Sequence, residues 1–411
     1  MTNLPQGWEW KSLGEICFIT DGTHKTPNYI ETGIPFLSVK NISKGFFDLS
    51  DVKYISLEEH NKLIKRAKPE FGDILICRIG TLGKAIKISL EFEFSIFVSL
   101  GLLKPKVKII SDYLVYFLNS CFIEEWINDN KVGGGTHTAK LNLNILEKCP
   151  IALPPLKEQE RIVGILDENF AKIDENIKIL EQDLLNLDEL MQSALQKAFN
   201  PLKDNAKENY KLPQGWEWKS LGEIANTSSG GTPSRNKKEY WENGNIKWLK
   251  SGELNDGYID FIEENITEEA IKNSSAKIFQ KGTLLIAMYG ATAGKLGILN
   301  LDSTTNQAIC AFLHKDKNIK FLEKFLFYFL FFLRDKIIKD SFGGAQPNIN
   351  QTYIKNLQIP LPPIKEQEQI ASHLDELSSH VKNLKQNYQV QIKDLQELKN
   401  SLLDKAFKGN L

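Results

Sequence analysis

The stretch LPQGWEWKSLGEI occupies residues 4–16, and the same thirteen letters return without a substitution at residues 212–224. A second pair lies downstream, where LPPLKEQE begins at Leu153 and LPPIKEQE begins at Leu361. Both pairs are offset by 208 residues, and the tripeptide KAF near the end of each half keeps that offset. The chain of 411 residues is therefore a tandem duplication over essentially its whole length.

The composition is that of an ordinary globular protein. Hydrophobic residues make up 42% and charged residues 25%, which suits packed cores in roughly two to four domains. The formal net charge of −1 neither requires nor excludes a polyanionic partner. Five scattered cysteines without a Cys-x-x-Cys pair predict neither disulfides nor a zinc site, which fits a cytoplasmic protein without a secretory signal. The apolar stretch 321–333 is too short to span a membrane and predicts a buried helix.

Each half begins as a globule and ends as a long helix. Residues 1–156 and 212–364 hold short β-branched and aromatic runs punctuated by Gly, Pro and Asn, which predict mixed α/β domains. Residues 157–199 carry apolar side chains at alternating spacings of three and four, and residues 365–411 keep this rhythm. With a linker at 200–211, the sequence predicts two tandem-repeated globular domains separated by two long antiparallel coiled-coil helices, related by a pseudo-two-fold axis.

The charges differ between these segments. The two globular segments are slightly basic, whereas residues 157–199 hold 5 basic and 10 acidic side chains. An acidic helix is unsuited to binding a polyanion along its length. We therefore expect this helix to act as a spacer or as a surface for docking proteins.

Together these features resemble the specificity (S) subunit of type I restriction-modification systems. The resemblance rests on the duplicated motifs, extended to Ile162 and Ile370, and on GGTPSR at 230–235 with TNQ at 305–307. It implies two target-recognition domains, each reading one half of an interrupted asymmetric site in double-stranded DNA. It also implies two methyltransferase and two restriction subunits as partners, which would carry S-adenosylmethionine, ATP and Mg. No catalytic residue, metal or cofactor is expected in this chain.

The residues predicted to contact DNA are loop residues that can donate hydrogen bonds. Arg and Lys suit guanine, Asn and Gln suit adenine, and Ser or Thr suit either base or phosphate. In the first domain they are Thr23, His24, Lys25, Lys40, Asn41, Arg78, Thr81, Lys84, Thr136, His137 and Thr138. In the second domain they are Thr232, Ser234, Arg235, Lys250, Ser251, Tyr289, Thr292, Lys295, Asn306, Gln307, Gln346 and Asn348.

Two other functions stay open on the residues alone. A self-sufficient methyltransferase or nuclease would need a cofactor or metal site, yet GATAGK at 290–295 lacks the spacing and the following Ser or Thr of a phosphate-binding loop and predicts a turn between strands. A coiled-coil scaffold for other ligands explains the helices but not the paired motifs. Activity of the purified chain alone would favour the enzyme. Absence of sequence-selective DNA binding in the presence of a methyltransferase partner would favour the scaffold.

Overall fold

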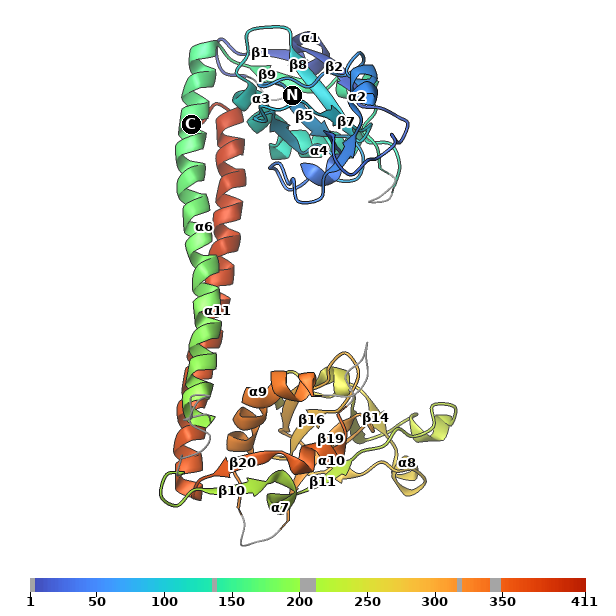
Figure 1. The fold of residues 1–411 in the computed structure, drawn as a ribbon, viewed down its shortest axis with the longest axis vertical. Helices are drawn as coiled ribbons and strands as arrows, with labels where there is room; N and C mark the ends of the chain where they lie inside the picture. The colour runs from blue at the N-terminus through green and yellow to red at the C-terminus, as the bar shows by residue number, and fades with distance from the viewer. Residues whose placement is uncertain (1–3, 135–138, 200–211, 316–319, 341–348) are drawn as a thin grey trace. The chain divides into compact units, whose positions relative to one another are not determined.

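The computed structural model describes residues 4–134, 139–199, 212–315, 320–340 and 349–411. The chain forms two compact units (Figure 1). Unit 1 comprises Met1–Glu181 with Gln389–Leu411, and unit 2 comprises Gln182–Tyr388. Each unit therefore contains one globule together with parts of two long helices, α6 (Leu156–Phe199) and α11 (Ile364–Phe407).

The globule of unit 1 contains three small sheets. A four-stranded antiparallel sheet has the order β2-β8-β5-β6, a three-stranded mixed sheet has the order β4-β3-β7, and β1 pairs with β9. The strands are β1 (Glu9–Ser12), β2 (Cys17–Asp21), β3 (Ile34–Leu37), β4 (Lys53–Ile55), β5 (Ile74–Cys77), β6 (Ala85–Lys87), β7 (Ser95–Ile96), β8 (Leu100–Pro105) and β9 (Pro150–Leu153). The helices are α1 (Leu13–Ile16), η1 (Val39–Asn41), α2 (Leu57–Leu63), α3 (Ser111–Leu118), α4 (Cys121–Asn130) and α5 (Leu143–Leu146).

Strand β5 lies at the centre of unit 1 and is buried on both faces. Ile74 and Ile76 point into one hydrophobic core with α3 and α4, while Leu75 and Cys77 point into a second core on the opposite face. This alternation explains why the strand reads as an uninterrupted apolar run, since neither face meets water.

The globule of unit 2 repeats this plan with additions. Its sheets have the orders β11-β19-β16-β17-β13, β14-β12-β18-β15 and β10-β20, so that β13 adds a parallel edge strand beside β17. The strands are β10 (Glu217–Ser220), β11 (Ala225–Ser229), β12 (Ile246–Leu249), β13 (Gly257–Ile259), β14 (Asn265–Ile266), β15 (Ile278–Phe279), β16 (Leu284–Ala287), β17 (Leu296–Leu299), β18 (Ser303–Thr305), β19 (Ile309–His314) and β20 (Gln358–Leu361). The helices are α7 (Leu221–Ile224), η2 (Lys238–Tyr240), η3 (Ser251–Glu253), α8 (Glu268–Lys272), α9 (Glu323–Lys339) and α10 (Gln351–Asn356).

The predicted buried helix corresponds to α9, whose residues Phe325 to Leu330 all lie in the main core of unit 2 against β16 and β17 (Figure 1). The predicted turn at GATAGK is also confirmed, because this segment joins β16 to β17 and has positive φ at Gly290 and Gly294. Among the described residues, no helix has the length and apolarity needed to cross a membrane.

The long helices pack against each other in both units. In unit 1, Ile162 and Leu166 of α6 share a core with Leu403 and Phe407 of α11. The start of α6 therefore meets the end of α11.

In unit 2, the end of α6 packs against the start of α11. Leu195 and Phe199 of α6 share a core with Ala371 and Leu374 of α11. The helices are therefore antiparallel, and the predicted mixed α/β class with two long packed helices is confirmed.

Candidate nucleic-acid interface

Several loops of unit 1 meet where β2, β3, β5 and β7 end and β8 begins. Backbone hydrogen bonds join these ends directly: Thr23 N donates to Ile96 O (3.1 Å), and Arg78 N donates to Ser99 O (2.9 Å). The segment after the 135–138 gap joins them, because Leu141 N donates to Arg78 O (2.9 Å). We call this surface the loop edge of unit 1; it comprises residues 22–25, 38–41, 78–84, 97–99 and 139–141.

Unit 2 builds the same edge from equivalent strands. Asn306 N donates to Leu249 O (2.9 Å), and Met288 N donates to Ala308 O (2.7 Å). Ile349 N in turn donates to the carbonyl of Met288 (2.7 Å). The loop edge of unit 2 comprises residues 230–235, 250–251, 288–295, 306–308 and 349–350.

Close backbone approach at both edges requires glycine. A Cβ added to Gly22 would lie 2.0 Å from Ile96 O, and one added to Gly230 would lie 2.0 Å from Thr305 O. These two glycines occupy equivalent positions in the duplicated halves, 208 residues apart. The duplication therefore preserved the backbone path that brings these loops together.

The predicted residues of unit 1 differ in their exposure. His24, Lys25, Lys40 and Thr81 are exposed, whereas Thr23 and Lys84 are half-buried. Thr23 Oγ1 accepts a hydrogen bond from Lys25 N (3.2 Å), which orders the start of this loop. The predicted Thr136, His137 and Thr138 lie outside the described residues.

Asn41 is buried and holds its own loop together. Its side-chain amide donates to the carbonyl of Asp48 (3.1 Å) and accepts from Ser38 N (2.9 Å). A side chain committed in this way has few groups left to offer to a ligand.

Arg78 is also buried, and it takes part in an ionic cluster around Asp21. Its guanidinium donates to the Asp21 carboxylate and to Leu141 O, the latter at 2.9 Å. Arg66 donates to the other carboxylate oxygen of Asp21 and, through Nε, to Asp21 O (3.2 Å). Burial by itself would raise the pKa of Asp21, but the hydrogen bonds and charges of Arg66 and Arg78 outweigh it and hold this pKa below its ordinary value.

Arg66 was missed by the sequence reasoning. It follows α2 in a turn that carries no glycine-rich motif, and its side chain reaches the loop edge only through the folded structure. The one clue in the sequence was its residue type, since the chain contains only five arginines.

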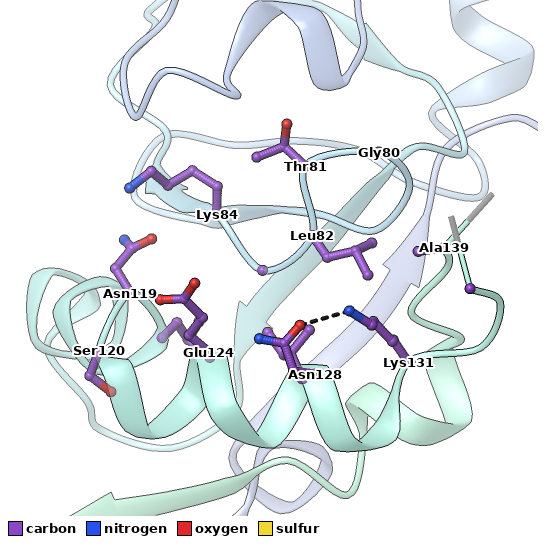
Figure 2. A pocket seen from close by; sticks show the side chains of 14 residues that line it. Gly80, Thr81, Leu82, Lys84, Asn119, Ser120, Glu124, Asn128, Lys131 and Ala139 are labelled. Carbon is purple, nitrogen blue, oxygen red and sulfur yellow. Dashed lines mark hydrogen bonds between the residues drawn. The ribbon is translucent and has the colours of Figure 1, made fainter. Parts of the chain in front are cut away.

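A pocket of about 470 Å³ lies beside the loop between β5 and β6 (Figure 2). Thr81 and Lys84 line it on the loop side, and Glu124, Asn128 and Lys131 face them from α4 and the residue after it. Lys131 Nζ donates to Asn128 Oδ1 at 2.8 Å. This pocket extends the polar surface of the loop edge. Because both carboxylate and ammonium groups line it, the lining favours neither an anionic nor a cationic ligand. The residues from α4 were not among those predicted.

The predicted residues of unit 2 form two connected groups. In the first, Thr232 Oγ1 donates to Gln307 Oε1, and the Gln307 side chain also interacts with the Tyr289 hydroxyl. The neighbouring Asn306 lies 3.5 Å from Ser251 Oγ through its amide nitrogen, and its Oδ1 is buried without a partner among the described residues. Amide groups of this kind can pair with adenine.

The second group is centred on Glu264, which accepts from Arg235 (2.6 Å) and Lys250 (2.8 Å). Burial would raise the pKa of Glu264, but these two cations outweigh it and lower the pKa. The Arg235 guanidinium also lies over the ring of Trp241, 3.7 Å from its centroid, and 4.8 Å from that of Trp248. Glu264 and the two indoles were not predicted.

The remaining predicted residues of unit 2 are separate from these groups. Ser234 and Lys295 are exposed and Thr292 is half-buried, the last two in the turn between β16 and β17. Gln346 and Asn348 lie outside the described residues.

Among the described residues, no group of three or more His, Cys, Asp or Glu is placed to hold a metal ion. Burial raises the pKa of four cysteine thiols to about 12, namely Cys17, Cys77, Cys149 and Cys310. These thiols are therefore protonated near neutral pH and behave as small apolar side chains.

Comparison with known proteins agrees with this geometry. The family model of the type I restriction modification DNA specificity domain matches residues 5–183 and again residues 213–394. The type I restriction enzyme StySPI specificity subunit of Salmonella potsdam is 27% identical over 433 aligned positions, which cover 99% of this chain and 90% of that protein.

Two solved structures share the fold. A chain from a structure of a type I R-M system superposes with a TM-score of 0.80 at 24% identity, and both chains are covered completely. The HsdS subunit from Thermoanaerobacter tengcongensis superposes with a TM-score of 0.61 at 23% identity, covering 100% of this chain and 99% of that one. The chain thus belongs to the type I restriction-modification specificity family, as a non-catalytic specificity (S) subunit with two target-recognition domains.

Proposed function

We propose that each loop edge binds double-stranded DNA and reads one half of an interrupted, asymmetric site. The observation that carries this proposal is that the two edges share a backbone frame but differ in their side chains. Where unit 1 has the buried ion Arg78, unit 2 has Met288, although both backbone amides donate to equivalent carbonyls. Two surfaces of equal shape and unequal chemistry are suited to reading two different sequences.

The proposed contacts are the exposed and half-buried residues of the two edges. Arg78 and Asn41 are left out, because both side chains are buried and bonded within the protein. In unit 1 the proposed contacts are Thr23, His24, Lys25, Lys40, Thr81 and Lys84, with Thr136, His137 and Thr138 as further candidates. In unit 2 they are Thr232, Ser234, Arg235, Lys250, Ser251, Tyr289, Thr292, Lys295, Asn306 and Gln307, with Gln346 and Asn348 as further candidates.

We further propose that residues 1–156 and 212–364 are the recognition domains, that 157–199 and 365–411 are spacer helices, and that 200–211 is a linker. Two methyltransferase and two restriction subunits would complete the assembly and carry S-adenosylmethionine, ATP and Mg. Such partners would supply much of the positive surface that DNA binding requires, which this chain of net charge −1 lacks. A cytoplasmic location fits the five free cysteines.

The test is to co-express the chain with its methyltransferase partner and map adenine methylation across the host genome by single-molecule sequencing. We expect one interrupted asymmetric motif. Exchanging residues 1–153 for those of a related subunit should change one half of the motif, and exchanging residues 212–361 should change the other half. Assembly of a complex that binds no DNA selectively, or a motif whose two halves change together, would contradict the proposal.

A further inference from the structure

Beside or within each loop edge lies one half-exposed arginine that shares a carboxylate with a second cation. In unit 1, Arg66 and Arg78 share Asp21. In unit 2, Arg235 and Lys250 share Glu264. The residues of the two clusters do not occupy equivalent positions in the duplicated halves. The shared arrangement was therefore not inherited through the duplication.

In unit 1 the carboxylate is the buried component. The Asp21 side chain is 2% exposed and that of Arg78 is 9% exposed, whereas that of Arg66 is 54% exposed. Arg66 is held at two points by Asp21, through a carboxylate oxygen and through the backbone carbonyl. Its guanidinium is therefore fixed from behind while its outer side faces solvent, beside the exposed ring of His24.

In unit 2, aromatic rings together with a carboxylate fix the orientation of the exposed arginine. The Arg235 side chain is 52% exposed and lies on Trp241, while Glu264 holds its Nη1. The loop that carries Arg235 is itself fixed, because Trp248 Nε1 donates to Gly231 O (3.0 Å) and Trp241 Nε1 donates to Ser234 O (3.1 Å).

Both clusters have more cations than shared carboxylates, and both have unused donors. One shared carboxylate between two cations gives a formal charge of about +1 for these three side chains at neutral pH. In unit 2, Glu253 and Glu263 also act on the charge of Lys250. Arg66 Nη1, and Nε and Nη2 of Arg235, have no hydrogen-bond partner among the described residues. A guanidinium that is already oriented loses less conformational entropy when it binds than a free lysine does.

We propose that Arg66 and Arg235 are specificity-determining residues, each reading a guanine in the half-site of its own unit. The inference rests on the proposed function. A fixed, planar guanidinium matches the O6 and N7 acceptors that guanine presents in the major groove. The exposed lysines of the edges, such as Lys25, Lys40 and Lys295, suit phosphate contacts that need no orientation.

The experiment compares Arg66→Lys and Arg235→Lys in the complex with the methyltransferase partner. Lysine keeps the charge and an ion pair with the carboxylate but loses the two-pronged donor. Methylation mapping should show that Arg66→Lys relaxes a guanine position in one half of the motif, and that Arg235→Lys relaxes one in the other half. The preference for guanine should fall roughly 5- to 150-fold, the range of one bidentate pair.

Two exposed lysines serve as matched controls. Lys62→Ala in unit 1 and Lys238→Ala in unit 2 each remove an exposed cation that pairs with a glutamate four residues away in the sequence. Lys62 pairs with Glu58, and Lys238 pairs with Glu242. Neither control should change the motif. A uniform loss of methylation with unchanged base preference, an unchanged motif, or both arginine variants acting on the same half would overturn the inference.

A change in the DNA tests the same contact without depending on a variant that folds. Replacing the guanine of one half-site by 7-deazaguanine removes the N7 acceptor, and we expect weaker binding by the unaltered complex. Unchanged binding after this replacement in both half-sites would overturn the inference. A half-site that contains no guanine would overturn it for the unit that reads that half-site. Absence of any interrupted motif for the unaltered complex would instead refute the proposed function.

Discussion

Asp21 is the residue on which the loop edge of unit 1 depends most. Its buried carboxylate balances Arg78, which is itself buried, and it anchors Arg66. A buried guanidinium that loses its carboxylate keeps its charge but no longer has a compensating partner, and this costs far more than the loss of a surface ion pair.

We expect Asp21→Asn to lower the free energy of unfolding by about 3–5 kcal/mol, because it leaves Arg78 charged, buried and unpaired. Urea denaturation of the purified chain, followed on unit 1 by hydrogen exchange, measures this loss. Asp51→Asn is the control, since Asp51 is 74% exposed and its ion pair with Lys53 spans 3.4 Å. That variant should change the free energy by less than about 1 kcal/mol. An equal effect of both substitutions would contradict the role given to Asp21.

The same carboxylate predicts a pH dependence. The pKa of Asp21 in the folded chain lies below its ordinary value of 3.8. A group with a lowered folded pKa contributes its full stability above its unfolded pKa and loses it as the pH falls through the folded pKa. Urea unfolding measured from pH 6 downward should therefore show the difference between the natural chain and Asp21→Asn shrinking below a pH of about 4. A difference that stays constant over this range would contradict the assignment.

At the scale of elements, one glutamine in each half fastens a long helix to its globule. Gln159 is 1% exposed; its Oε1 accepts from Ile110 N (2.9 Å) and its Nε2 donates to Pro154 O (2.9 Å). Gln367 makes the corresponding bonds with Leu322 N (2.8 Å) and Pro362 O (2.9 Å) in unit 2. Ile110 and Leu322 are the N-cap residues of α3 and α9. Each glutamine therefore joins its long helix to the start of a second helix and to the proline that follows β9 or β20.

We expect Gln159→Ala to destabilise unit 1 by about 1–3 kcal/mol for each buried group left unbonded. The most direct measurement is hydrogen exchange at the Ile110 amide, which should become faster because its acceptor is gone. Gln182→Ala removes an exposed glutamine of α6 that bonds only within its own helix, to Asn186 (3.1 Å), and should leave exchange at Ile110 unchanged. Unchanged exchange in Gln159→Ala would show that the glutamine does not fasten the helix.

At the scale of the whole molecule, the paired helices should set the distance between the half-sites. Helix α6 packs against α11 in each unit. A change in the length of one helix alone would shift this packing out of register, so the same change must be made in both helices. A heptad is the natural increment, because seven residues restore the seam to the same face.

Inserting one heptad into α6 after Glu181 and one into α11 after Tyr388 should lengthen the gap of the methylated motif by about three base pairs. Seven helical residues add about 10 Å, and DNA rises about 3.4 Å per base pair. Both half-sites should remain the same, as read by methylation mapping. Insertion into α6 alone misaligns the seam and should abolish methylation. A gap that ignores the double insertion would contradict the spacer role.

The sequence by itself was sufficient for the duplication, the α/β class, the long helices and the family. Repeats, apolar periodicity and short motifs are properties of the linear sequence and do not depend on contacts between distant residues. Several residues predicted to contact DNA lie in loops at strand ends, because Gly, Asn and Thr in polar segments mark such ends. Their contact with DNA stays a prediction. Thr232 and Gln307 are far apart in the sequence but are hydrogen-bonded in the fold. Arg235 and Lys250 likewise meet there at Glu264.

Only the tertiary structure decided which of the predicted side chains are exposed to a ligand. It also decided which unpredicted residues lie beside them. Arg66 and Asp21 are 45 residues apart and meet because β2 and the turn after α2 end at the same edge. Arg78 looks like a loop arginine in the sequence, yet its bond to Leu141 O, 63 residues away, turns it inward. The physical reason is that burial and ion pairing depend on strand order and loop packing. These bring together residues that are far apart in the sequence, and no pattern in the sequence indicates that they touch.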